Sequence, residues 1–193
     1  VHDIIAKKEG KPVYKLFTNA FRRIPTTITI GIKDEANTRR TARELLQRFP
    51  SLRRIKLKIE GSERDIDRIN WVIEEVPSRI EITLDANQGF KTPEEAIKVI
   101  KMIEDSFGDR ILLMEEPVRK GWYEALKKIS DSVDLPIYAD ESAATYEDAK
   151  KVVEMECADG INIKLQKAGG IYWGKKIAEL ATDNGLGVMV GCM

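Results

Sequence analysis

Ionisable side chains in this sequence lie at the ends of short apolar segments. In residues 53–61, RRIKLKIEG, Lys56 and Lys58 alternate with apolar residues. Because side chains two positions apart share one face of a strand, this alternation predicts that both lysines point to the same side. Later apolar segments end in three carboxylates and a further lysine, namely Asp85, Glu115, Asp140 and Lys164. An edge strand also carries lysines for solubility, but the accompanying carboxylates favour a site for metal-assisted proton transfer.

The three carboxylates make up the predicted metal site. Carboxylate oxygens from neighbouring strand ends suit a hard, octahedral cation that keeps positions open for substrate, which describes Mg²⁺ better than zinc. Each acid alone also fits a helix cap, whereas three together, each closing an apolar strand, favour the metal site. Glu116 follows Glu115 directly, and the strand before them is apolar on both faces. Alternation therefore cannot choose between these two glutamates.

The lysines supply the predicted proton chemistry. Removing a proton next to a carboxylate adds negative charge to oxygens that already carry one, and a divalent cation stabilises that charge. A lysine acts as a base near neutral pH only if burial and neighbouring cations lower its pKa to about 7–8. We expect Lys56 and the metal ion to lower the pKa of Lys58 in this way.

The elements that must position these residues alternate regularly along the chain. Segments with β-branched residues or period-two alternation predict strands, and apolar residues at helical spacing predict helices. In order, the first expected elements are a strand at 26–32, a helix at 38–49, a strand at 53–61, a helix at 65–76, a strand at 79–87 and a helix at 93–107. The alternation continues to the end of the chain, with seven strands and six helices in all. Since hairpins cannot join parallel neighbours, this order predicts a parallel sheet with helical crossovers.

Two parallel architectures are compatible with this order, an open doubly wound sheet and a closed barrel. A dinucleotide-binding sheet requires a glycine-rich turn after an early strand, and the one glycine pair, Gly169 and Gly170, comes late. Barrel enzymes instead take catalytic groups from the carboxyl ends of many strands. The sequence therefore predicts an α/β fold of the (β/α)₈ TIM-barrel type, incomplete, with about seven strands and six barrel helices and no eighth strand.

Composition narrows the choice of partner. Thirty-two basic and thirty-two acidic residues give a formal net charge of zero, which argues against nucleic acid and anionic membranes. No apolar run approaches the ~18 residues of a membrane span. Cys157 and Cys192 are isolated, which indicates neither a zinc site nor a disulfide and fits a cytoplasmic setting. We therefore expect a small-molecule substrate, no nucleic acid and no membrane.

Five segments, KLKI, LDANQGF, MEEP, ADES and INIKLQKAGG, resemble those of the enolase superfamily and specifically its muconate lactonizing enzyme subgroup, which includes the dipeptide epimerases. This superfamily combines a lysine or histidine base with Mg²⁺. The resemblance implies three Mg²⁺ ligands, Asp85, Glu115 and Asp140. Its Glu-x-Pro pattern favours Glu115 over Glu116 and leaves Asn87 and Glu141 in supporting positions beside the ligands.

The resemblance also implies roles for the remaining polar residues. Lys58 and Lys164 correspond to the two acid/base lysines on opposite faces of the substrate, an arrangement that allows inversion. Lys56 corresponds to the lysine that supports the substrate carboxylate and its neighbour's ionisation, and Thr29 is expected to line the pocket. His2 is the one histidine and lies in the first few residues, which disfavours the histidine-dependent mandelate racemase branch.

These residues together predict a Mg²⁺-dependent epimerase or racemase that abstracts a proton next to a carboxylate or amide carbonyl through an enolate. The expected substrate is a small carboxylate or a dipeptide, as in epimerases of the L-Ala-D/L-Glu type. Two alternatives stay open. One is a cycloisomerase of the muconate type or a dehydratase of the o-succinylbenzoate synthase type, which would use the same lysines and metal. The other is a non-catalytic barrel fragment.

The ends of the sequence predict its domain organisation. Residues 1–25 are expected to be a segment that links to the family's capping domain, and residues 26–193 to be a partial barrel. The sequence stops after the seventh expected strand, so two sheet edges would lack a neighbour and would favour homo-oligomers or other self-association. We expect such an isolated chain to turn over little or no substrate.

Overall fold

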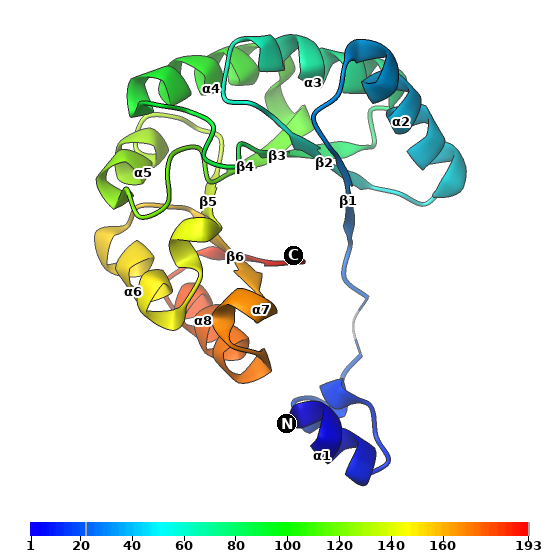
Figure 1. Ribbon diagram of the computed structural model, residues 1–193, viewed down its shortest axis with the longest axis vertical. Coiled ribbons are helices and arrows are strands. Elements are labelled where there is room, and N and C mark those ends of the chain that lie inside the picture. Colours follow the sequence, from blue (N-terminus) through cyan, green and yellow to red (C-terminus); the bar gives the residue numbers. More distant parts are fainter. Residues whose placement is uncertain (22, 193) are drawn as a thin grey trace.

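The computed structural model describes residues 1–21 and 23–192 of the chain. Seven parallel strands form one sheet in which each strand pairs with the next along the sequence. They are β1 (Thr27–Ile30), β2 (Arg54–Lys58), β3 (Glu81–Asp85), β4 (Ile111–Glu115), β5 (Ile137–Ala139), β6 (Gly160–Lys164) and β7 (Gly187–Gly191). The sheet curls into part of a barrel, with the crossover helices on its outer face (Figure 1). The predicted seven-stranded parallel barrel is thus confirmed.

The helices follow the strands in the expected alternation. The described helices are α1 (His2–Lys8), α2 (Glu35–Arg48), α3 (Arg64–Glu75), α4 (Pro93–Phe107), α5 (Tyr123–Ser130), α6 (Tyr146–Met155), α7 (Leu165–Ala168) and α8 (Ile171–Asp183). Short 3₁₀ helices lie at η1 (Val13–Leu16), η2 (Gly108–Arg110) and η3 (Glu141–Ala143). The structure adds α7, a single turn directly after β6, which the periodicity of the sequence did not indicate.

Local sequence explains why α4 has the bounds that were predicted for it. The Thr92 hydroxyl accepts a hydrogen bond from the Glu95 backbone N–H at 3.2 Å, and Pro93 occupies the first turn, where its missing N–H costs nothing. At the other end Gly108 has a φ of 50°, a conformation that favours glycine and ends the helix. Both ends are therefore encoded within a few residues.

The hydrophobic core lies between the sheet and its helices. On β2, Ile55 and Leu57 are fully buried against the helices, while the alternating Lys56 and Lys58 point to the inner face of the curled sheet. Burying a side chain such as Leu57 contributes about 1.5–3 kcal/mol. The predicted strand alternation therefore sorts the lysines to the inside of the barrel and the apolar residues to the outside.

The register of the sheet aligns the ends of neighbouring strands. Lys58 pairs with Asp85, and Asp85 pairs with Glu115, so the last residues of β2, β3 and β4 lie side by side. On the far side of the sheet, Lys164 at the end of β6 pairs with Gly191. Since all strands are parallel, these residues face the same open end of the barrel.

The first residues lie apart from the sheet. Helix α1 and η1 pack on each other, and the His2 ring lies 5.1 Å from the Phe17 ring. Between this unit and β1, residues 18–21 and 23–26 have no regular secondary structure (Figure 1). Among the described residues, none of the helices has the length and apolar character that crossing a membrane requires.

Candidate active site at the carboxyl ends of the strands

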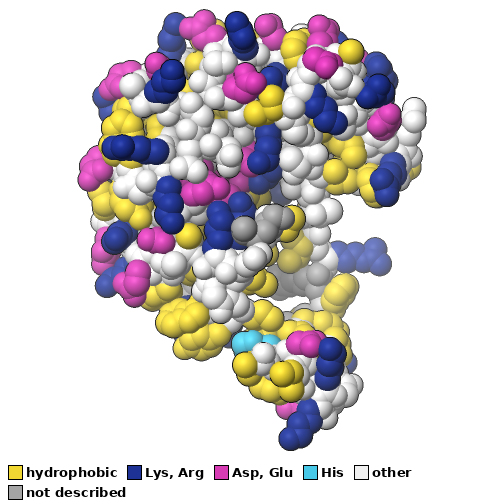
Figure 2. All heavy atoms as spheres, viewed as in Figure 1, with side chains coloured by type: hydrophobic (Ala, Val, Ile, Leu, Met, Phe, Trp, Pro, Cys, Tyr) yellow, Lys and Arg dark blue, Asp and Glu magenta, His cyan; other side chains and the backbone are white. Residues whose placement is uncertain are grey.

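Three buried carboxylates lie at the open end of the barrel, as the sequence predicted. Asp85 ends β3, Glu115 ends β4 and Asp140 follows β5, and their exposed fractions are 6%, 0% and 2%. Acidic and basic side chains lie next to one another near the middle of this face (Figure 2). Buried carboxylates require partners because burial disfavours their charged form.

The two lysines of β2 face these carboxylates. Lys56 Nζ lies 2.6 Å from Glu115 and 3.9 Å from Asp85 Oδ2. Lys58 Nζ lies 4.0 Å from the same Asp85 oxygen, and 41% of the Lys58 side chain is exposed, against 12% for Lys56. The arrangement fits Lys56 as a fixed electrostatic partner of the carboxylates and leaves Lys58 accessible from the mouth of the barrel.

Lysines from the opposite side of the sheet hold Asp140. Lys164 Nζ lies 2.5 Å from Asp140 Oδ2, and Lys167 Nζ of α7 lies 3.2 Å from Asp140 Oδ1 and 3.5 Å from Glu141. Burial acts to lower the pKa of Lys164, but its hydrogen bond and ion pair with Asp140 outweigh this and raise the pKa. Lys167 is not among the predicted site residues, because it lies on α7 and not at the end of a strand.

The neighbouring glutamates Glu115 and Glu116 have different tasks. Burial raises the pKa of the Glu115 carboxyl, with Lys56 acting against this. Glu116 turns away under the next loop, where its Oε2 accepts the backbone N–H of Asp140 at 2.8 Å and of Ser142 at 3.1 Å, and its Oε1 accepts the Ser142 hydroxyl. Its φ of 38° is uncommon for a residue with a side chain and re-aims it relative to Glu115. Glu116 therefore holds the loop that carries Asp140.

An amide group joins the two sides of the site. Asn162 Nδ2 donates a hydrogen bond to Glu115 Oε2 at 2.8 Å and a longer one to Asp140 Oδ2 at 3.4 Å. Asn162 lies two residues before Lys164 on β6 and therefore shares its face of the sheet. That alternation is the signal in the sequence that points to Asn162, which is not among the predicted site residues.

A single buried carboxylate outside this site, that of Asp65, orders the loop that follows Lys58. Asp65 is fully buried, and its carboxylate accepts the backbone N–H groups of Glu60, Gly61 and Ser62 at 3.0, 2.8 and 2.8 Å. Arg68 donates to the same carboxylate at 2.9 Å. A buried, paired carboxylate with several donors is a rigid anchor, so Asp65 fixes the chain just beyond the end of β2.

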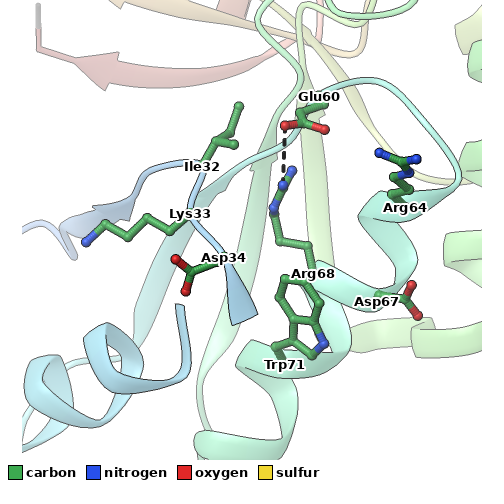
Figure 3. Close-up of a pocket in the computed structure, with 8 residues that line it drawn as sticks. All are labelled: Ile32, Lys33, Asp34, Glu60, Arg64, Asp67, Arg68 and Trp71. Atoms are coloured by element: carbon green, nitrogen blue, oxygen red, sulfur yellow. Dashed lines mark ion pairs between the residues drawn. The ribbon is translucent and has the colours of Figure 1, made fainter. Parts of the chain in front are cut away.

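A groove of about 470 Å³ lies beside this anchor, between the loop after β1 and helix α3. Figure 3 shows its lining and the 3.4 Å ion pair between Arg68 and Glu60. The lining residues are Ile32, Lys33, Asp34, Glu60, Arg64, Asp67, Arg68 and Trp71. They combine three acidic with three basic side chains and include no predicted site residue. The groove therefore marks the rim of the barrel mouth and not its centre.

Three further predicted residues make fewer contacts in the site than the carboxylates and lysines do. Thr29 pairs with Lys56 across β1 and β2 but is exposed. The Asn87 side chain is also exposed, although its backbone N–H donates to Asp85 Oδ1 at 3.1 Å. Glu141 contacts Lys167 as noted above, and its Oε2 is buried without a hydrogen-bond partner. The support predicted from Asn87 thus comes from its backbone.

The donor set fits a hard cation. Within residues 1–21 and 23–192, no group of three histidine, cysteine or acidic side chains is already arranged as a metal cage, since the carboxylates face lysines. Glu115 Oε1 is buried and accepts no hydrogen bond. Lys56 Nζ lies 2.6 Å away, but the angles do not meet those of a hydrogen bond. All three predicted ligands offer oxygen, which Mg²⁺ prefers. The oxygen donors of Asp85, Glu115 and Asp140 therefore fit the chemistry of Mg²⁺.

Comparison with known proteins gives one family and a consistent set of relatives. Residues 35–193 match the family model described as Enolase C-terminal domain-like. The L-Ala-D/L-Glu epimerase of Clostridium acetobutylicum is 34% identical over 194 residues, which covers 100% of this chain and 53% of that protein. The hydrophobic dipeptide epimerase of Enterococcus faecalis is 36% identical and is covered to the same 53%. This chain thus spans about half the length of the curated relatives it matches.

Solved structures agree with these relatives. The substrate-liganded complex of the L-Ala-D/L-Glu epimerase from Bacillus subtilis superposes with a TM-score of 0.92 at 36% identity, covering 100% of this chain and 53% of that one. The dipeptide epimerase from Enterococcus faecalis, complexed with Mg and the dipeptide L-Leu-L-Tyr, gives a TM-score of 0.91 at 35% identity, with the same two coverages. The curled sheet and its helices are therefore shared along the whole chain.

Proposed function

This chain belongs to the Enolase C-terminal domain-like family, and from this we propose that the protein is an epimerase or racemase acting on the carbon next to a carboxylate or amide carbonyl. A dipeptide is the proposed substrate. Relatives named as dipeptide epimerases cover the whole chain, which supports both parts of the proposal. This chain covers 53% of the length of those relatives, so activity and substrate are proposals about the whole protein.

The observation that carries this proposal is the placement of two lysines on either side of the carboxylates. Lys58 ends β2 and approaches Asp85, whereas Lys164 ends β6 and contacts Asp140. Three strands, β3 to β5, lie between them in the sheet. A substrate held over the carboxylates would therefore meet one amine on each side, which is the arrangement that inversion of a carbon centre requires.

We infer the following division of work among the side chains. One lysine, as the neutral amine, removes the α proton, and the other, as the ammonium ion, returns a proton to the opposite side. The same pair then serves both directions, with the roles of Lys58 and Lys164 exchanged. Lys56, held between Glu115 and Asp85, adds positive charge where the substrate carboxylate would lie.

Mg²⁺ is the proposed cofactor, held by Asp85, Glu115 and Asp140. When bound, it would stabilise the negative charge that proton removal places on the substrate oxygens. The buried, oxygen-only donor set supports this assignment, and so does Glu115 Oε1, which accepts no hydrogen bond and already faces the positive charge of Lys56 at 2.6 Å. A related dipeptide epimerase is described in complex with Mg, which adds support at the level of the family.

We also propose the domain division at about residue 25. Helix α1 and η1 precede β1 and pack on each other, apart from the sheet. Limited proteolysis should then cut the connection before β1 and leave the fragment that begins near residue 26 intact. Cleavage within the barrel helices at the same rate would contradict this division.

Hydrogen exchange at the substrate tests the proposed reaction. The complete protein is incubated in D₂O with Mg²⁺ and either L-Ala-L-Glu or L-Leu-L-Tyr, and the α-carbon signals are followed by NMR. An epimerase replaces one α hydrogen by deuterium and produces the diastereomer of the dipeptide. No water or other group is lost from the substrate. A Lys58→Ala/Lys164→Ala double variant is the control for exchange outside the site. Loss of water from a hydroxy acid, with no exchange in any dipeptide, would favour the dehydratase alternative instead.

A further inference from the structure

Asn162 is a neutral side chain among charged ones at the centre of the site. It is 2% exposed and lies on the inner face of β6, two residues before Lys164. Its neighbours are carboxylates and lysines, which carry charge in water. An amide carries no net charge. Asn162 therefore acts here by orienting its neighbours through hydrogen bonds and not by adding charge.

The amide is oriented by its neighbours. Nδ2 donates to Glu115 Oε2 at 2.8 Å and to Asp140 Oδ2 at 3.4 Å. Ionised carboxylates only accept hydrogen bonds, so a flipped amide would set its oxygen against two further oxygens. The donor side of Asn162 must therefore face Glu115 and Asp140, and its oxygen must face away from them.

This contact distinguishes the two oxygens of Glu115. Oε2 receives two donors, Lys56 Nζ at 2.6 Å and Asn162 Nδ2 at 2.8 Å. Oε1 is buried and receives no hydrogen bond, although the Lys56 ammonium group forms an ion pair with it at 2.6 Å. The amide, together with Lys56, therefore fixes the rotation of the carboxylate and leaves Oε1 as the oxygen that faces positive charge and accepts no hydrogen bond.

The same amide links two strand ends. Glu115 belongs to β4, and Asp140 follows β5, where Lys164 also contacts Oδ2 at 2.5 Å. A single Nδ2 group between them limits how far the two carboxylates can move apart. Supporting groups of this kind typically alter metal affinity by about 10–100-fold when they are removed.

Gly191 on β7 provides the space that Asn162 occupies. A Cβ atom added at Gly191 would lie 2.4 Å from Asn162 Oδ1 and 3.0 Å from its Nδ2, closer than side chains tolerate. The requirement for glycine here is therefore one of volume. Any larger residue at position 191 would push the amide toward the carboxylates or turn it away from them.

We propose that Asn162, seated against Gly191, is a positioning residue that presents Glu115 Oε1 and holds Asp140 for cation binding. This inference rests on the proposed function, since it assumes that Glu115 and Asp140 bind Mg²⁺. Asn162 need not touch the substrate. Its effect passes through Glu115 and Asp140, whose geometry it sets.

The test is a double-mutant cycle on the complete protein. Mg²⁺ binding is measured by calorimetry for the wild type, Asn162→Ala, Gly191→Ala and the double variant. Each single change should weaken Mg²⁺ binding by about 10–100-fold. In the Asn162→Ala background the Gly191→Ala change should add almost nothing, because the atoms that it displaces are already gone. Val190→Ala is the matched control, since Val190 is the adjacent residue and is 68% exposed.

Two further readouts separate positioning from loss of fold. The melting temperature of the metal-free variants is expected to stay near that of the wild type, and the EPR spectrum of bound Mn²⁺ should change in Asn162→Ala but not in Val190→Ala. If Gly191→Ala does not fold, the affinity and spectrum of Asn162→Ala decide alone. Wild-type affinity in Asn162→Ala, or additive losses in the double variant, overturns the inference while leaving the proposed function standing. A wild-type protein that binds no Mg²⁺ overturns both.

Discussion

Lys164 Nζ lies 2.5 Å from Asp140 Oδ2, so a proposed acid/base group and a proposed metal ligand form one ion pair across neighbouring strand ends. Lys56 and Glu115 repeat this relationship at 2.6 Å on the other side of the site. Buried charges persist only when paired, because desolvation costs several kcal/mol per ion. The lysines therefore stabilise the carboxylates in the absence of a cation and lie where a substrate anion would bind.

The carboxylates should bind Mg²⁺ as a set. Asp85→Asn, Glu115→Gln and Asp140→Asn should each weaken binding by more than about tenfold, since even groups that only support a ligand have effects of that size. Isothermal calorimetry on the complete protein measures this. Asp67→Asn is the matched control, because Asp67 is an exposed acid outside the site. Unchanged affinity in all three amide variants would show that the cation binds elsewhere.

Replacing Lys58 and replacing Lys164 should abolish α-hydrogen exchange of opposite stereoisomers of the substrate. Lys58→Ala and Lys164→Ala should each lower epimerisation by about 10²–10⁴-fold, the usual contribution of a general acid or base. Exchange of the α hydrogen for deuterium, followed by NMR, should be lost for one stereoisomer in Lys58→Ala and for the other in Lys164→Ala. Exposed Lys101 offers the control Lys101→Ala. Loss of exchange on the same stereoisomer in both variants would contradict the assignment of one lysine to each side.

Asp65 should be important for stability, because its fully buried carboxylate satisfies Arg68 and three backbone N–H groups. Asp65→Ala leaves these donors unpaired and should lower the free energy of unfolding by about 3–5 kcal/mol. Urea unfolding followed by circular dichroism measures the loss. Asp67→Ala, two residues away on the same helix, should stay within about 0.5 kcal/mol of the wild type. Equal losses of unfolding free energy in Asp65→Ala and Asp67→Ala would show that Asp65 does not anchor the loop.

The two cysteines should differ sharply in reactivity. Cys192 is exposed, whereas Cys157 is buried and its pKa is raised by burial to about 11. Because the thiolate is the reactive form, a thiol reagent at pH 8 should modify Cys192 at once and Cys157 only after denaturant is added. Counting the modified thiols by mass spectrometry checks this, with Cys192→Ser as the control. Rapid modification of Cys157 in the native protein would be the opposite result.

Cys157 should also make the free energy of unfolding decrease at alkaline pH. Its pKa rises from 9.0 to about 11 on folding, so the folded state keeps its proton where the unfolded state loses it. The contribution of the buried thiol is complete below about pH 9 and is lost as the pH rises through 11, by about 2–3 kcal/mol in total. Denaturant unfolding of wild type and Cys157→Ala across this range should show a steeper decline in the wild type. Parallel curves would contradict the shift.

Short-range patterns in the sequence account for the elements and for the faces they present. Lys56 and Lys58 point inward because they alternate with buried Ile55 and Leu57, and that alternation depends only on strand geometry. Thr92 and Gly108 define the ends of α4 because caps act within one helical turn. Alternating strands and helices predicted a parallel sheet, and the polar residues at the strand ends favoured a curled barrel over an open sheet.

Tertiary structure decided how these faces meet. Asn162 contacts Glu115 because the register of β4, β5 and β6 brings them together, and nothing near either residue in the sequence records that register. Glu116 contacts the loop after Asp140 through a backbone conformation that strand alternation does not describe.

The sequence by itself determined the fold class, the inward lysines and the carboxylates at the strand ends, because each depends on neighbours a few residues away. Only the tertiary structure decided that Thr29 is exposed, that Lys167 joins Asp140, and that Asn162 fits against Gly191. Such contacts join residues far apart in the chain, and their geometry depends on how strands align and on how much volume each neighbour leaves. Local preferences carry no information on either quantity.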